Sequence, residues 1–161
     1  MTGIDRSTGN GMEQEMNEAN LTEALARVIE DGTDRRWFDF GRDPEVAEEI
    51  GRTIAEQIRE DVPDVVLCLE HEEDAVLAHV IARRLGATRV VLREQEGLLW
   101  FSHELPKGSS VVAISVDPGR EKPREVLFEM LSSHNARLTY LVRLTPDQTT
   151  TPDEWVIRNA Q

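Results

Sequence analysis

The spacing of apolar residues changes several times along the chain, and each change predicts a different element. The clearest helix begins at Asp43-Pro44, where a capping residue precedes proline at the first helical position. Its apolar residues recur every four positions and therefore share one face: Val46, Ile50, Ile54 and Ile58. We expect this helix to pack against a core through that face.

Four apolar runs are too short for helices and are not interrupted by a regular polar pattern. Runs of this kind are typical of strands that are covered on both faces. They are residues 64–70, 88–93, 110–115 and 136–144. Two amphipathic helices are predicted between them, one burying Ala75, Val76, Val80 and Ile81 and one burying Val126, Leu127, Met130 and Leu131. Strands that alternate with helices predict an α/β fold, a Rossmann-like single domain with a mainly parallel sheet flanked by helices.

The segments outside this alternating pattern comprise two terminal stretches, one more helix and two short strands. Residues 1–20 have no apolar periodicity and predict a disordered acidic tail, so the domain is expected to span residues 21–145. A first helix is predicted from Leu21 to about residue 31, and short strands are predicted at residues 36–40 and 98–101. Residues 146–161 form a polar C-terminal extension, in which the apolar residues 155–157 are expected to pack back onto the domain.

Composition and charge narrow the classes of partner. With 161 residues, 39% of them hydrophobic, the chain suits one domain with a substantial core, and no apolar run approaches the roughly 20 residues of a membrane span. The net charge of -13 repels nucleic-acid phosphates and anionic lipid, so we expect neither nucleic acid nor a membrane as partner. A single cysteine, Cys68, and no recognisable signal peptide predict a cytoplasmic protein.

Two stretches carry candidate chemistry. The first, residues 70–74, places four carboxylates around one histidine at the start of a predicted helix. Such carboxylates stabilise a helix N-terminus, and the alternative is a divalent-metal site formed by Glu70, His71 and Asp74. The second stretch precedes the next helix, where Gly119, Arg120 and Lys122 predict either an anion site or an ordinary turn. No nucleophile elbow, phosphate-binding Walker loop, zinc spacing or dinucleotide fingerprint is present.

From about residue 21 to residue 144, the order of elements resembles that of the type I phosphoribosyltransferases, most of all the orotate branch. Residues 64–70 and the helix after them resemble the strand that carries the family's pyrophosphate loop. Residues 90–93 resemble the strand that ends in its Arg-Lys pair, and residues 105–114 resemble the approach to its signature strand. The resemblance implies the family's fold, a homodimer, and chemistry on phosphoribosyl pyrophosphate with magnesium.

The chemistry-bearing positions depart from the family pattern at four elements. The acidic pair that ends the signature strand is replaced by Ser115-Val116, with Asp117 one place later. The loop that cradles the 5'-phosphate contains two prolines and Glu121, and the small residues of the pyrophosphate loop are replaced by the carboxylates of residues 70–74. The Arg-Lys pair appears as Arg93-Glu94, and the long mobile loop is reduced to residues 95–104.

These departures predict a phosphoribosyltransferase-like domain that has lost efficient catalysis and acts as a binding or regulatory module for a phosphorylated small molecule, as a homodimer. The first alternative is an active glycosyltransferase of this family. In it, Asp117 would be the catalytic candidate and would hold magnesium, while the other substrate-binding residues would be Arg93, Ser115, Gly119, Arg120 and Lys122. The second alternative is a divalent-metal-binding module built on Glu70, His71 and Asp74.

Overall fold

The computed structural model describes residues 20–116, 122–146 and 156–158. They form a six-stranded sheet in the order β5-β4-β3-β6-β7-β8. The four central strands are parallel, and β5 and β8 are antiparallel edge strands. The strands are β3 (Val65–Leu69), β4 (Thr88–Gln95), β5 (Leu98–Phe101), β6 (Ser110–Ser115), β7 (Arg137–Arg143) and β8 (Val156–Arg158). The predicted α/β class and mainly parallel sheet are therefore confirmed.

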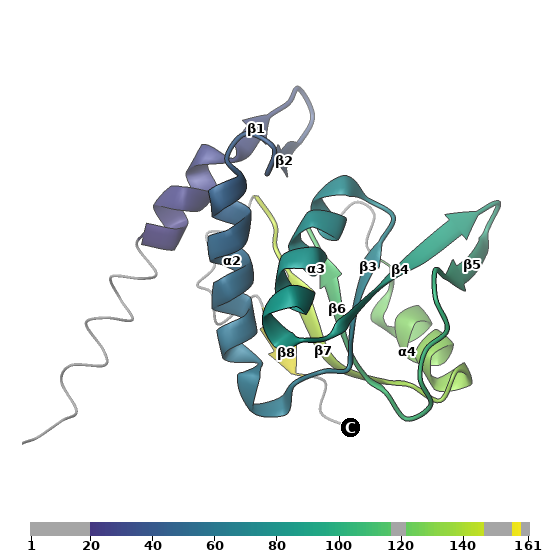
Figure 1. Cartoon of the computed structure of the whole chain (residues 1–161). Coiled ribbons are helices and arrows are strands. Elements are labelled where there is room, and N and C mark those ends of the chain that lie inside the picture. The colour runs from purple at the N-terminus through teal and green to yellow at the C-terminus, as the bar shows by residue number, and fades with distance from the viewer. Residues whose placement is uncertain (1–19, 117–121, 147–155, 159–161) are drawn as a thin grey trace, which may run out of the picture.

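Helices cover both faces of the sheet (Figure 1). One face packs against α2 (Pro44–Gln57), which continues into the short 3-10 helix η1 (Arg59–Asp61), and α3 (Glu72–Leu85); the other packs against α4 (Arg124–Ser133). The four residues predicted to line α2, Val46, Ile50, Ile54 and Ile58, are all fully buried. Because both faces are covered, every residue of β6 is buried, as its unbroken apolar run predicts.

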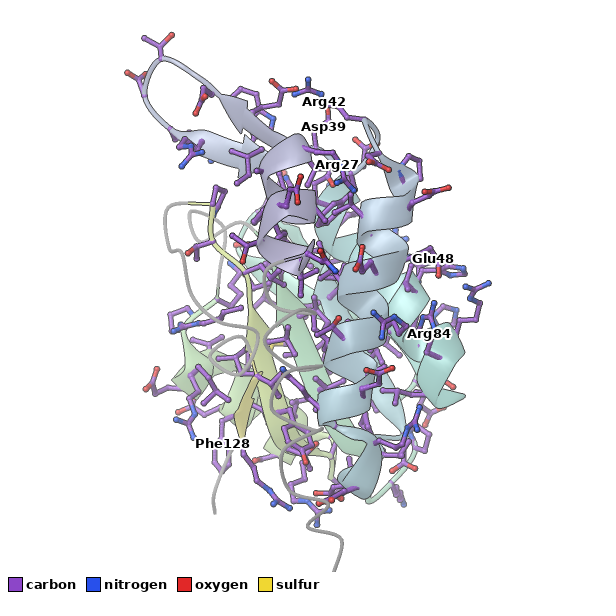
Figure 2. The ribbon with its side chains drawn as sticks, turned by 90° about the vertical axis from the view of Figure 1, so that its left-hand side faces the viewer. Arg27, Asp39, Arg42, Glu48, Arg84 and Phe128 are labelled. Atoms are coloured by element: carbon purple, nitrogen blue, oxygen red, sulfur yellow. The ribbon has the colours of Figure 1, made fainter. Side chains whose placement is uncertain are left out.

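Ion pairs on the outer surface join α2 to α3. In Figure 2, Glu48 of α2 lies beside Arg84 of α3. The Glu48 carboxylate accepts hydrogen bonds from Arg83 at 2.8 Å and from Arg84 at 3.2 Å. These side chains are exposed, so the close approach of the two helices is stabilised mainly by the apolar residues beneath them.

The N-terminal part of the domain differs from its prediction. The first helix ends at residue 27, not near residue 31, because Ile29–Asp31 forms β1 and pairs with β2 (Arg36–Phe38) in a separate two-stranded sheet. The Gly32 N–H donates to the Arg35 carbonyl at 2.9 Å and closes the turn. Figure 1 shows this β1–β2 hairpin beyond the carboxyl ends of the central strands.

A second correction concerns α3. Val80 and Ile81 are buried as predicted and Ala75 is partly buried. Val76 was also expected to be buried but is 38% exposed, and Leu77 and Ala78 are buried instead. The buried face is rotated relative to the predicted one because α3 packs against α2 as well as against the sheet. At the other end of the chain, β8 pairs with β7, so part of the segment at residues 155–157 packs onto the domain as expected. No helix of the described residues is long and apolar enough to span a membrane.

Candidate functional site

The candidate site lies where the strand order reverses. The chain runs from β3 through α3 to β4 on one side, and later enters β6 on the other side of β3. In open α/β sheets, ligands bind outside the carboxyl ends of strands at such a switch point. Leu69, the last residue of β3, and Ser115, the last residue of β6, lie at this edge. The predicted site residues of these two strands are therefore brought together by the topology.

The first cation of this edge, Arg93, is paired within the chain. Its Nη1 lies 3.5 Å from Oε1 of Glu70, the residue that follows β3. Both side chains are about half exposed, so water screens the pair and its contribution to stability is small. The consequence for the site is larger, since an incoming anion at Arg93 would have to compete with a carboxylate already beside it.

The second cation, Lys122, is paired in the same way. Its Nζ contacts Oε2 of Glu94, which is near the end of β4. The lysine side chain is only 23% exposed, so this pair is less accessible to water than the Arg93 pair. Both described cations among the predicted substrate-binding residues therefore have an internal carboxylate partner. The predicted residues Asp117, Gly119 and Arg120 lie outside the described residues.

Asp74, in the first turn of α3, contacts the backbone just beyond the end of β6. Its side chain is 1% exposed, and its Oδ1 accepts a hydrogen bond of 2.8 Å from the backbone N–H of Val116, just after β6. A buried carboxylate is costly unless it is hydrogen-bonded, and this N–H supplies a bond. Asp74 therefore ties the start of α3 to the point where the chain leaves β6.

Glu73 joins α3 to the segment that follows the β1–β2 hairpin. Its Oε2 accepts a hydrogen bond of 2.9 Å from the backbone N–H of Phe40. Burial raises the pKa of the Glu73 carboxyl, the bond from Phe40 opposes that shift, and the nearby carboxylates Asp39 and Glu72 add to it. The native protein therefore binds a proton at Glu73 more readily than the unfolded chain does.

This shift predicts a pH-dependent effect of Glu73→Gln. The raised pKa means that wild-type stability from this group is present below pH 4.5, its ordinary pKa, and is lost as pH rises through the raised value. Glutamine keeps an acceptor for Phe40 but carries no charge. We expect the variant to melt at a higher temperature than wild type at pH 7, with the difference shrinking toward pH 4. Glu45→Gln, which removes an exposed first-turn carboxylate of α2, is the control.

An open pocket of about 440 Å³ lies between the β1–β2 hairpin and the carboxyl edge of the sheet. Its lining combines aromatic residues with charged groups of both signs, and Val116 belongs to its wall. The residues are Arg35, Trp37, Phe38, Asp39, His71, Glu72, Glu73 and Val116. The pocket has room for a small molecule, and three of its four charged side chains are acidic.

Solved structures of one enzyme class share this architecture, whereas no protein-family model and no curated protein matches the sequence. Adenine phosphoribosyltransferase from Saccharomyces cerevisiae, complexed with an imino-altritol bisphosphate and adenine, is 16% identical over 79% of this chain and 88% of its own, with a TM-score of 0.59. Orotate phosphoribosyltransferase from Mycobacterium tuberculosis, complexed with inorganic phosphate, is 17% identical over 79% and 74%, also with a TM-score of 0.59. The chain has the type I phosphoribosyltransferase fold.

A longer protein with this fold matches as well. UMP synthase from Leishmania donovani is 18% identical, with 91% of this chain and 37% of that chain covered and a TM-score of 0.59. Adenine and orotate enzymes match this phosphoribosyltransferase-like chain equally well in TM-score. The shared fold therefore does not distinguish the orotate branch, which the order of elements resembles, from the adenine branch.

Within this phosphoribosyltransferase fold, the two residues that our sequence interpretation matched to the family's acidic pair are buried. Ser115 is 6% exposed and Val116 is 3% exposed. Ser115 lines a small, mostly apolar pocket beside Leu127 of α4, on the opposite side of the sheet from the core that contains Val116. Neither residue supplies a charge at the edge of the sheet, and Val116 presents only an apolar side chain to the larger pocket.

The three residues of the metal-site alternative are directed to different surroundings. Glu70 pairs with Arg93, Asp74 bonds to the Val116 N–H, and His71 lines the larger pocket. Over the described parts of the chain, no group of three His, Cys, Asp or Glu side chains is arranged to hold a metal ion. The geometry therefore gives no support to the metal-binding alternative.

The bond from Phe40 to Glu73 was missed by sequence reasoning, which treated the four carboxylates of residues 70–74 as one cluster. The burial of these carboxylates differs because each occupies a different position of the connection between β3 and α3. Asp74 is buried, Glu73 is half-buried, and Glu72 is exposed. The α3 face that packs against α2 and β6 would have distinguished Asp74, but the predicted face included the exposed Val76 and omitted the buried Leu77 and Ala78.

Proposed function

We propose that this domain keeps the phosphoribosyltransferase fold without efficient transferase activity and acts as a homodimeric binding or regulatory module. One observation carries the proposal: Arg93 and Lys122 are each paired with a carboxylate of the same chain. An anion at either cation must displace that carboxylate or tolerate it at about 4 Å, where two like charges repel by about 1 kcal/mol in water and about 4 kcal/mol near a protein surface.

The end of β6 supports the same proposal. A ribose with two hydroxyls is bound well by carboxylates that accept its hydrogen bonds, and residues 115 and 116 are a buried serine and a buried valine. The acidic side chains at this edge come instead from Glu70, Glu73 and Asp74, and all three have partners within the chain. At this edge the carboxylates therefore bind groups of their own chain, whereas a transferase needs them to bind its substrate.

Calorimetric titration with phosphoribosyl pyrophosphate and magnesium tests the proposal. We expect no binding tighter than about 100 μM, which corresponds to about -5.5 kcal/mol, and no pyrophosphate release on addition of orotate or adenine. Tight binding together with pyrophosphate release would show an active transferase and overturn the proposal. Release with only one of the two bases would also assign the branch.

A double variant tests whether the internal carboxylates suppress anion binding. In Glu70→Gln/Glu94→Gln, Arg93 and Lys122 lose their charged partners, so we expect affinity for phosphoribosyl pyrophosphate to rise by up to about tenfold, or about 1.4 kcal/mol. Glu56→Gln is the matched control, because it breaks the exposed pair with Arg52 on α2, away from the site. An affinity equal to that of the control would show that the two pairs do not limit anion binding.

A further inference from the structure

The outermost strand of the sheet, β5, exposes apolar side chains at an open edge. Leu98 is 72% exposed and Trp100 is 41% exposed, on the face opposite the partly buried Leu99 and Phe101, which pack toward the core beneath α4. The strand contains no charge and no proline, the devices by which edge strands commonly resist pairing with other chains. Figure 1 shows β4 and β5 projecting together beyond the helices.

The backbone of β5 is also available for pairing. Glu96 and Gly97 have φ angles of 52° and 80° and form the two-residue turn between β4 and β5. Across such a turn, Gln95 and Leu98 form a hydrogen-bonded pair, so the N–H and C=O of the next residue, Leu99, point away from β4. No strand of the described residues pairs with this outer edge.

We propose that β5 pairs antiparallel with β5 of a second copy of this chain, which joins the two sheets into one. The two-fold symmetry of such a pair requires the edge to be complementary to itself. With Leu99 on the axis, its free N–H and C=O bond to the partner's Leu99, and Leu98 lies directly opposite the partner's Trp100. The two exposed apolar side chains of each copy thereby cover those of the other.

Charge favours a second copy at this edge. Two chains of net charge -13 repel each other over most of their surfaces, whereas residues 98–101 carry no charge.

This inference rests on the homodimer of the proposed function and names its surface. A four-residue edge buries less than the roughly 1,200 to 2,000 Å² of stable complexes, so the pairing is weak and depends on protein concentration. Sedimentation velocity from about 5 μM to 500 μM should show the mass rising from 18.2 kDa toward twice that value. Leu98→Lys should keep the protein monomeric throughout, because it places a charge on each side of the axis.

Phe128→Lys is the matched control, since Phe128 is also exposed, at 42%, but lies on α4 (Figure 2). It should dimerise like wild type. A wild-type chain that stays monomeric at every concentration overturns both the homodimer and this inference, and leaves the open edge for a different strand-forming partner. A dimer that Leu98→Lys does not weaken overturns only the inference, because the homodimer then uses another surface. The transferase titration is independent of both results.

A cross-linking variant tests the register directly. In the proposed pair, Leu99 of one copy lies opposite Leu99 of the other as a hydrogen-bonded pair with Cα atoms about 5.5 Å apart, within the range of a disulfide. Leu99→Cys, which keeps both exposed apolar side chains, should therefore give covalent dimers on mild oxidation. The native thiol does not compete, because burial raises the pKa of Cys68 to about 12. Only background cross-linking, as in Phe128→Cys, would overturn the register.

Discussion

Asp74→Ala is expected to lower the free energy of unfolding by about 2 to 3 kcal/mol. The substitution removes a charge-assisted hydrogen bond, and it leaves the backbone N–H of Val116 without that acceptor in a buried position. A lost bond to a charged group costs about 1.5 to 3 kcal/mol, and a buried donor left unsatisfied adds its desolvation cost. Chemical denaturation at pH 7 measures the loss as a lower midpoint at an unchanged slope.

Two variants separate this bond from other effects of residue 74. Asp74→Asn retains an oxygen that can accept from Val116, so its loss should be clearly smaller than that of alanine. Glu72→Ala removes an exposed carboxylate from the same first turn of α3 and should cost no more than about 1 kcal/mol. If the Asp74 and Glu72 variants lost equal stability, the carboxylate would act through the helix dipole and not through Val116.

The strands and α2 could be predicted because their patterns are long and unambiguous. The residues from Val46 to Ile58 repeat without interruption, and the run at residues 110–115 is apolar throughout. The same rule failed at Ile29, whose spacing from Leu21 and Leu25 suits a helix. That residue joins β1 because residues 36–38 lie within reach of a tight hairpin and because the Asp39 N–H bonds to the Val28 carbonyl at 2.7 Å. Local periodicity contains no information about such pairing.

The location of the candidate site was predictable, but its internal contacts were not. Strand ends follow from sequence, and the carboxyl ends of neighbouring parallel strands meet at one edge, which places Glu70 and Ser115 together. Which carboxylate meets which cation depends on strand order and side-chain direction. Lys122 and Glu94 are 28 residues apart, and Asp74 and Val116 are 42 residues apart. Single-sequence patterns do not report contacts at such separations, so the carboxylate partners of Lys122 and Val116 could not be predicted.

The packing of α2 against α3 depends on a glycine. A Cβ atom at Gly51 would lie 3.0 Å from Cβ of Val80 on α3 and closer still to its Cγ1. Valine has few alternative rotamers in a helix, so it cannot easily turn away. Gly51 therefore permits a close helix–helix approach that alanine would obstruct.

We expect Gly51→Ala to destabilise the protein by about 1 to 2 kcal/mol. Overpacking costs about 1 to 3 kcal/mol, while alanine in a helix regains up to about 1 kcal/mol relative to glycine. In a Val80→Ala background the Cγ1 contact is absent but the 3.0 Å contact with Cβ of residue 80 remains, so the same Gly51→Ala change should cost clearly less than it does in wild type. A double-mutant cycle from denaturant midpoints measures the coupling between the two sites. If Gly51→Ala had the same effect in both backgrounds, the glycine would not be required by the packing of α2 on α3.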